Sequence, residues 1–263
     1  SNIHRLEKGL LMNPRRGVFA TDYIEETVEC FVKIVGQCNL PRQLWPEEQQ
    51  WASDVLANYF DVIEPHPAIL EAKNEFETLI APSRQSCENG QKIPYSRDLE
   101  TSPAVTVEQL MSLARRRRSV RWFLQQSVPR EMIDCAIEVA AQSPSACNRQ
   151  PFVYRVFDDP SLVQRAAQIP MGTAGYAENI PVFIVIVGRQ RNYFDERDRH
   201  LIYIDASLAT MGLIYALEAQ GLSSCCINWP DIEDREIRMS RLLGLDADER
   251  PVMCLAVGYP DPS

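Results

Sequence analysis

The segment Leu201–Gln220 restricts the fold more than any other part of the chain. It reads LIYIDASLATMGLIYALEAQ, and its only charged residues are Asp205 and Glu218. As an α-helix it would be about 30 Å long, with apolar side chains on nearly every side. Because such a helix must be covered all round, we expect either a central core helix or a helix shared with a second subunit. Gly221 supplies a C-terminal stop.

The sequence around this helix alternates between helical and extended patterns. Short β-branched or apolar runs predict strands at Val153–Phe157, Val182–Val187, Ser223–Ile227 and Val252–Val257. Thr106 and Gln109 resemble a capping box at the start of a helix that runs into Arg115–Arg118. Further helices are predicted at Pro129–Ala141, Pro160–Ala167 and Ile232–Leu243. Four strands separated by helices indicate an α+β or α/β sandwich.

The first hundred residues have a different texture, which is helical from Asp22 to about Ile80. Thr21 or Asp22 can cap the first of these helices, and Pro46 and Pro67 each open another. A polar stretch with prolines and glycine then interrupts the periodicity and is typical of a linker: Pro82, Ser83, Gly90, Pro94 and Pro103. We therefore expect residues 1–103 to form a helical extension with its linker, and residues 104–263 to form the second domain.

Charge and composition narrow the functional classes. The 36 acidic residues exceed the 27 basic ones, and a net charge of −9 argues against a general nucleic-acid binder. The longest apolar run, Val182–Val187, is far short of the about 20 residues that cross a bilayer, so no membrane segment is expected. No basic-then-apolar leader is visible. The eight cysteines lack CxxC spacing, so we expect no metal site, and reduced, mostly buried thiols in the cytoplasm.

The arginine segment, Arg115–Arg121, reads RRRRSVR and is the first candidate for chemistry. A basic cluster at the end of a helix also has a structural explanation, because it complements the negative end of the helix dipole. A functional explanation requires a phosphate, which suits the planar donor fork of arginine and the hydroxyl of Ser119. Nucleic acid is a remote third possibility, because no aromatic residues are interleaved with these arginines.

The proline loop, Pro144–Pro151, is the second candidate and lies between a predicted helix and a predicted strand. Its two prolines restrict the backbone, so regular structure cannot use all of its amides and carbonyls. Ser145, Asn148 and Gln150 can each donate and accept hydrogen bonds. They either cap their own loop or recognise the edge of a heterocycle.

Taken together and in order, these features resemble the nitroreductase family of FMN-dependent oxidoreductases, over about Thr106 to Tyr259. The resemblance rests on the RRS-x-R segment, the PSA-x-N-x-QP segment, the long apolar helix ending in a GL turn, and the late strand ending in VGYP. It implies an α+β fold: a three-layer α/β/α sandwich with a central mixed sheet and a long buried helix. It also implies a homodimer with FMN at the subunit interface, which would account for the apolar helix.

The resemblance further implies a set of cofactor-binding residues. Arg117, Arg118 and Ser119 would hold the FMN phosphate and ribityl chain, and Arg121 would lie near the pyrimidine side of the ring. The partner chain would contribute Pro144, Ser145, Ala146, Asn148 and Gln150. A backbone N–H of the loop Cys226, Ile227, Asn228 and Trp229 would meet the reactive flavin nitrogen. Gly172 and Thr173 would approach the ring edge.

The implied activity is transfer of a hydride from NADH or NADPH, through FMN, to a conjugated small-molecule acceptor such as a nitroaromatic or a quinone. No catalytic side chain is then required, because the chemistry takes place at the flavin. Two alternatives remain open: a specialised member that dehalogenates or dehydrogenates one metabolite, and a flavin-binding scaffold without turnover. For the N-terminal region we favour a packed appendage over a lid, because Phe31, Trp51, Phe60 and Phe76 have the spacing of core residues.

Overall fold

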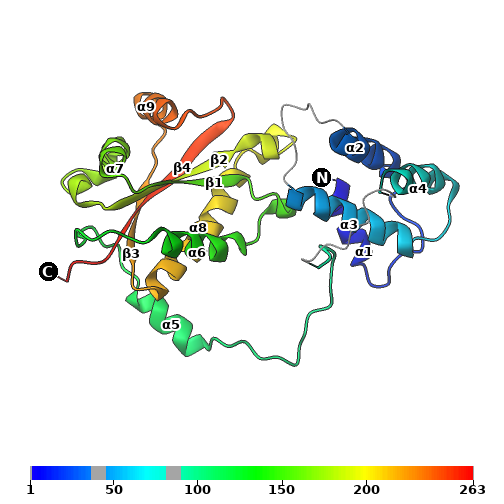
Figure 1. Cartoon of the computed structure of the whole chain (residues 1–263), viewed down its shortest axis with the longest axis horizontal. Helices are drawn as coiled ribbons and strands as arrows, with labels where there is room; N and C mark the ends of the chain where they lie inside the picture. The colour runs from blue at the N-terminus through cyan, green and yellow to red at the C-terminus, as the bar shows by residue number, and fades with distance from the viewer. Residues whose placement is uncertain (1, 37–45, 81–89, 263) are drawn as a thin grey trace. The chain divides into compact units, whose positions relative to one another are not determined.

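The chain divides into two compact units, Ser1–Ser102 and Pro103–Ser263 (Figure 1). The structure is a computed structural model that describes residues 2–36, 46–80 and 90–262. The division falls at the end of the stretch predicted as a linker. Residues 90–103 contain no helix or strand, while Pro82 and Ser83 lie outside the described residues.

The first unit contains four described helices: α1 (Asn2–Leu10), α2 (Ile24–Gly36), α3 (Pro46–Val62) and α4 (Pro67–Ile80). The last three confirm the predicted helices, including the proline starts of α3 and α4. Helix α1 was missed, because it is short and buries only Ile3 and Leu6. The four residues predicted for the core of this unit all belong to one apolar cluster: Phe31, Phe60 and Phe76 are buried in it, and Trp51 packs against it. The Trp51 Nε1–H donates to Glu7 Oε1 at 2.7 Å.

The second unit is built on a four-stranded sheet in the order β1-β2-β4-β3. Its strands are β1 (Phe152–Phe157), β2 (Val182–Arg189), β3 (Ser223–Asn228) and β4 (Glu249–Gly258). All three pairings between these strands are antiparallel. The parallel component of the expected mixed sheet is limited to an isolated bridge between Ser119 and Ser224.

Helices cover both faces of this sheet and complete the three layers (Figure 1). One apolar core joins a sheet face to α7 (Pro160–Ala167) and α9 (Glu233–Leu243). The other core joins the opposite face to α6 (Arg130–Ala141) and α8 (Leu201–Ala219). Helix α5 (Val107–Arg116) precedes them and carries the predicted capping box of Thr106 and Gln109. The α+β class and the three-layer sandwich are therefore confirmed.

Helix α8 is only partly covered within one chain. Its buried side includes Ala206, Ala209 and Leu213, and it approaches β2 so closely that a Cβ on Gly188 would lie 2.8 Å from Ile202 Cβ. On the other side, Tyr203, Ile204 and Leu208 are 41%, 48% and 48% exposed. By length and composition the segment Glu196–Ala219 could also cross a membrane, a test that core helices pass as well. Residues 2–36, 46–80 and 90–262 thus leave an apolar stripe of α8 uncovered.

The expectation of mostly buried thiols is wrong for the described cysteines. Cys225 and Cys254 are buried, but Cys30, Cys135, Cys147 and Cys226 are exposed. Side chains alternate between the two faces of a strand, so Cys226 faces away from its buried neighbour on β3. Cys38 and Cys87 lie outside the described residues.

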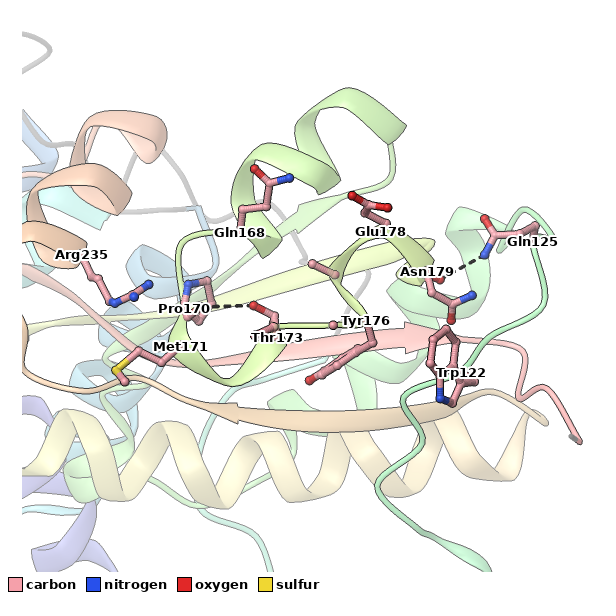
Figure 2. Close-up of a pocket in the computed structure, with 13 residues that line it drawn as sticks. Trp122, Gln125, Gln168, Pro170, Met171, Thr173, Tyr176, Glu178, Asn179 and Arg235 are labelled. Atoms are coloured by element: carbon pink, nitrogen blue, oxygen red, sulfur yellow. Dashed lines mark hydrogen bonds between the residues drawn. The ribbon is translucent and has the colours of Figure 1, made fainter.

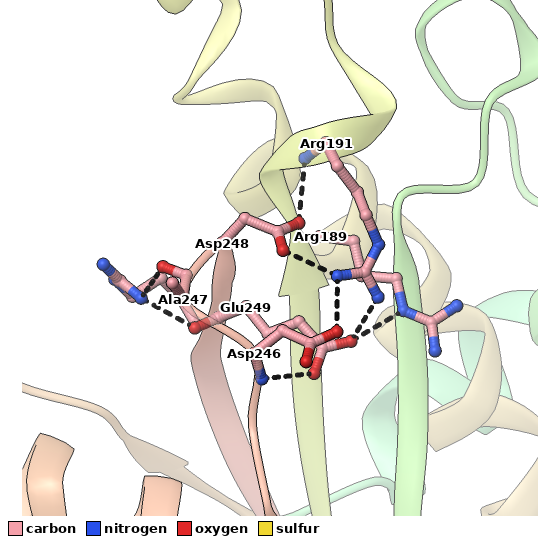
Figure 3. Close-up of polar contacts among 7 residues, drawn as sticks. Arg189, Arg191, Asp246, Ala247, Asp248 and Glu249 are labelled. Atoms are coloured by element: carbon pink, nitrogen blue, oxygen red, sulfur yellow. Dashed lines mark hydrogen bonds and ion pairs between the residues drawn. The ribbon is translucent and has the colours of Figure 1, made fainter. Parts of the chain in front are cut away.

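An ion-pair network ties the end of β2 to the start of β4 (Figure 3). The buried Glu249 carboxylate accepts from Arg189 Nε at 3.0 Å and from an Arg191 guanidinium nitrogen at 2.7 Å. Asp248 accepts from the same Arg191 at 2.7 Å. Burial acts to raise the pKa of Glu249, but the Asp246 backbone N–H and the two arginines outweigh it and lower that pKa.

Replacing Glu249 by alanine is expected to lower the free energy of unfolding by about 3 kcal/mol, because two partly buried guanidiniums lose their shared partner. Because the pKa of Glu249 is lower in the folded protein, this stabilisation is fully present above the ordinary glutamate pKa of 4.5. It is lost as the pH falls through the lower pKa of the folded state. Urea titrations at pH 7 and pH 4 measure the difference. Asp246→Ala is the control: its side chain is 61% exposed, so a loss below about 1 kcal/mol is expected. Equal losses for the two variants would contradict this assignment.

Candidate functional site

The two charged residues of α8 each anchor one of the two candidate segments. Glu218, near the end of the helix, is buried and accepts from Arg116 Nε at 3.0 Å and from the Ser223 hydroxyl at 3.2 Å. Arg116 is therefore used to hold the arginine segment against α8. The segment then continues beside β3, where the Val120 N–H donates to the Ser224 carbonyl at 3.1 Å.

Asp205, near the start of α8, anchors the proline loop. Its buried carboxylate accepts from the Ala146 backbone N–H at 3.1 Å and from the Tyr193 hydroxyl. Reciprocal bonds between Arg149 and Asn192, of 2.9 and 3.1 Å, tie the other side of the loop to the segment before α8. A buried carboxylate with these partners fixes where the loop lies.

The proline loop has an unusual backbone. Cys147, Asn148 and Gln150 have φ values of 54°, 51° and 42°, which is a costly region for residues with side chains. The Ser145 hydroxyl accepts from the Gln150 N–H at 2.9 Å, and the Gln150 side-chain amide donates to the Ala141 carbonyl at 2.9 Å. Ser145 and Gln150 thus stabilise the loop conformation, and Asn148 and Cys147 remain exposed.

The two segments lie near opposite ends of α8. Glu218 follows Asp205 by 13 residues, which corresponds to about 20 Å along the helix axis. In Figure 1, α5 meets α8 at its orange, C-terminal end. One chain therefore does not gather the arginine segment and the proline loop around a common point.

The arginine segment offers donors that fit a phosphate. No carboxylate in the described part of the chain forms an ion pair with Arg117, Arg118 or Arg121, in contrast to Arg116. Arg117 is half-buried at the C-cap of α5, and Arg118, Ser119 and Arg121 are exposed. Unpaired guanidiniums beside a hydroxyl match the donor set that phosphate oxygens require.

Strand β3 brings two further groups of predicted residues next to the arginine segment. It is an edge strand, and in the described chain its outer edge carries only the Ser119 bridge. The side chains of Ile227 and Trp229 are buried, whereas Cys226 and Asn228 are exposed. A Cβ on Gly172 would lie 3.3 Å from Ile227 Cγ2, so the loop with Gly172 and Thr173 packs closely on this strand.

Two titratable groups mark the contact between these elements. Cys226 is exposed as a residue, but the atoms packed around its sulfur desolvate the thiol. This desolvation, then Cys225, raises the pKa of the Cys226 thiol, although Arg117 acts to lower it. Cys226 is therefore a neutral thiol at pH 7 and a poor nucleophile. Burial, then Cys225, also raises the pKa of Tyr176 to about 12, against the opposing effect of Arg121. Tyr176 thus keeps its proton beside Arg121 and can donate it in a hydrogen bond.

A cavity of about 770 Å³ opens beside Tyr176 (Figure 2). Its walls come from the segment after Arg121, the loop before β2 and one residue of α9: Trp122, Gln125, Gln168, Pro170, Met171, Thr173, Ala174, Gly175, Tyr176, Ala177, Glu178, Asn179 and Arg235. This volume is typical of a small-molecule site. The Thr173 hydroxyl is used inside the loop, because it donates to the Ala167 and Pro170 carbonyls at 2.6 and 3.1 Å.

The structure thus brings together the predicted residues of the arginine segment, of β3 and of the loop with Gly172, and it separates the proline loop from them. Sequence reasoning missed Tyr193, Trp122, Tyr176 and Arg235 as participants. Of the contacts that hold the site together, only the acidic anchors Asp205 and Glu218 carried a signal in the sequence, because two acidic residues in an otherwise apolar helix require partners. In the described residues no group of three His, Cys, Asp or Glu side chains could hold a metal ion.

Comparison with known proteins bears directly on this site. The sequence profile of the Nitroreductase family matches residues 114–174 and 161–259, together more than half of the chain. Iodotyrosine deiodinase 1 of Homo sapiens is 26% identical over 207 residues, which span 67% of this chain and 71% of that protein. Iodotyrosine deiodinase of Thermotoga neapolitana is 27% identical over 180 residues, 59% of this chain and 90% of that protein. The solved FMN-dependent nitroreductase of Clostridium difficile R20291 shares the fold, with a TM-score of 0.52, 21% identity, and coverage of 58% of this chain and 88% of that one.

Proposed function

Because the chain belongs to the nitroreductase family of oxidoreductases, we propose that it binds FMN between two copies of itself and reduces a conjugated acceptor with NADH or NADPH. The observation that carries this proposal is the placement of the two candidate segments at opposite ends of α8. Two copies with antiparallel α8 helices would set the arginine segment of one near the proline loop of the other.

The uncovered apolar surface supports the same assembly. Ile204 and Leu208 are exposed on α8, and the half-exposed Met211 and Tyr215 continue their stripe at helical spacing. Helix α5 contains no buried residue, and its apolar side chains Val107 and Leu110 are 74% and 49% exposed. Contiguous exposed apolar surface marks an interaction site, and a second copy would cover it.

The residues of the chain would position the cofactor and exclude water. Arg117, Arg118 and Ser119 would hold the phosphate and ribityl chain, and Arg121 would stabilise negative charge at the pyrimidine end of the reduced ring. A backbone N–H of residues 226–229 would face the reactive nitrogen. The partner's loop, from Pro144 to Gln150, would close the other side. Bound FMN would supply the redox chemistry, which is the relay of a hydride from the nicotinamide to the acceptor.

The overall reaction balances without an acid, base or nucleophile from the chain. With a quinone, NADH and one proton give the hydroquinone and NAD⁺. With a nitroaromatic, NADH and one proton give the nitroso compound, NAD⁺ and water. The chain contributes orientation of the two reactants and preorganised charge.

A second candidate is reductive dehalogenation of an aromatic compound. It is favoured by the relatives named iodotyrosine deiodinase in both Homo sapiens and Thermotoga neapolitana. In this reaction an aryl iodide and NADPH give the deiodinated ring, NADP⁺ and iodide. Release of iodide from an iodophenol, compared with consumption of a quinone or nitroaromatic at the same enzyme concentration, discriminates between the two candidates.

Titration of the purified protein with FMN tests the proposal. We expect quenching of flavin fluorescence with about one FMN per chain, followed by oxidation of NADH or NADPH when a quinone is added. A protein that takes up no FMN would overturn the proposal. Uptake without nicotinamide oxidation, over a panel of quinones, nitroaromatics and iodophenols, would instead identify a flavin-binding scaffold.

A further inference from the structure

The cavity beside Tyr176 contains an arginine that the proposed flavin site does not use. Arg235, on the first turn of α9, is half-buried and lines one end of the cavity (Figure 2). In the part of the chain that the structure describes, its guanidinium donates to the Ile169 carbonyl and forms no ion pair with a carboxylate. By contrast, Arg238, one turn later, is near Asp234 at 3.9 Å.

A half-buried guanidinium without a counterion favours an anion. Burial of a charge is costly unless it is paired, and a carboxylate can pair with the planar donor fork of arginine in two parallel hydrogen bonds. The contact with Ile169 orients the guanidinium and leaves further N–H donors for such a ligand. In Figure 2 the acidic residue of the cavity, Glu178, lies on the far side of Gln168 from Arg235. An anionic group is therefore expected at the Arg235 end.

The rest of the cavity suits an aromatic ring. Trp122 is 55% exposed and Met171 is 56% exposed, both on its walls. The Tyr176 ring projects into the space between them in Figure 2. Indole, phenol and thioether groups bind aromatic ligands through stacking and S–aromatic contacts. Tyr176 also joins the cavity to Arg121 and Cys225, which belong to the arginine segment and β3.

We propose that this cavity is the acceptor site and that it selects aromatic carboxylates, with Arg235 pairing with the carboxylate and Trp122 contacting the ring. The proposal deepens the proposed function and rests on it for the identity of the ligand as an acceptor. Arg235 is then a residue that determines specificity and takes no part in the redox chemistry.

Two acceptors that share the nitrophenyl ring test the proposal: 4-nitrobenzoate, which carries a carboxylate in the para position, and 4-nitrobenzyl alcohol, which carries a neutral hydroxymethyl group there. Isothermal titration calorimetry on the FMN-loaded protein and on the flavin-free protein measures binding of each compound, and NADH oxidation measures kcat/KM. We expect 4-nitrobenzoate to bind more tightly than the alcohol. Arg235→Gln should weaken its binding and lower its kcat/KM by about 10- to 100-fold, and change the values for the alcohol by less than about 3-fold.

Two further variants exclude a general effect on folding. Arg235→Lys keeps the charge and should recover part of the preference for 4-nitrobenzoate, and Arg238→Gln should keep all of it. Equal binding of the two acceptors to the unsubstituted protein would overturn the proposal, as would equal losses for both in Arg235→Gln. If FMN does not bind but Arg235-dependent binding of 4-nitrobenzoate persists in calorimetry, the proposed function fails and the aromatic-carboxylate site stands.

Discussion

Replacing Arg117 and Arg118 together by alanine is expected to weaken FMN binding by about 100- to 1,000-fold. Hydrogen bonds to a charged group contribute about 1.5–3 kcal/mol each, and neighbouring contacts do not add fully. Neither guanidinium has a carboxylate partner in the described chain, so their removal leaves no unpaired acid behind and should preserve the fold. Titrations followed by flavin fluorescence give the dissociation constants.

Arg115→Ala is the matched control for this double substitution. Arg115 is exposed on the last turn of α5 and precedes the C-cap, so its loss removes one positive charge from the same helix end. Its effect on FMN binding should be below about 5-fold, the size of a screened surface charge. A double variant that keeps the FMN affinity of the unsubstituted protein would remove the arginine segment from the site.

Leu208→Glu is expected to convert the proposed dimer into monomers and to abolish FMN binding with it. Leu208 is 48% exposed on the apolar stripe of α8, and a carboxylate there would be buried in both copies. Burial of an unpaired charge costs several kcal/mol per ion, which weakens the proposed association by about 1,000-fold or more. Sedimentation velocity reports the mass, and FMN titration of the same samples reports the site.

Ile237→Glu controls for the added charge. Ile237 lies on α9 and is 40% exposed, but it is not part of the stripe on α8. This variant should remain dimeric and keep its FMN affinity. If Leu208→Glu also remains a dimer with bound FMN, the stripe is not the interface.

The periodic elements of this fold were predictable because each has a local cause. Pro46 and Pro67 begin α3 and α4, Thr106 caps α5 through Gln109, and the run Val182–Val187 lies within the central β2. The sheet order was not predictable, since β-pairing depends on contacts between distant segments. Helix α1 was missed for a local reason: it has nine residues and two buried side chains, which give a weak periodic pattern.

The two candidate segments were predictable, but their connections within the fold were not. The donor groups of the arginine segment and of the proline loop are visible in the sequence, and their contact with FMN stays a prediction. The partners of the two acidic anchors, Glu218 and Asp205, could not be recognised. Arg116 and Glu218 are 102 positions apart, and Ala146 and Asp205 are 59 positions apart. The separation of the two segments along α8 follows from these contacts, and the proposed second copy depends on it.

A mixed dimer tests the shared site most directly. One chain carries Arg117→Ala and Arg118→Ala. The other carries Ala146→Trp, whose bulk obstructs the proline loop without removing the backbone contact to Asp205. Co-expression with two different affinity tags isolates the mixed pair. If each FMN lies between the arginine segment of one copy and the proline loop of the other, the mixed dimer contains one site without any substitution and binds FMN there with unsubstituted affinity. Failure to recover any such site, with both parent dimers impaired, would contradict the shared site.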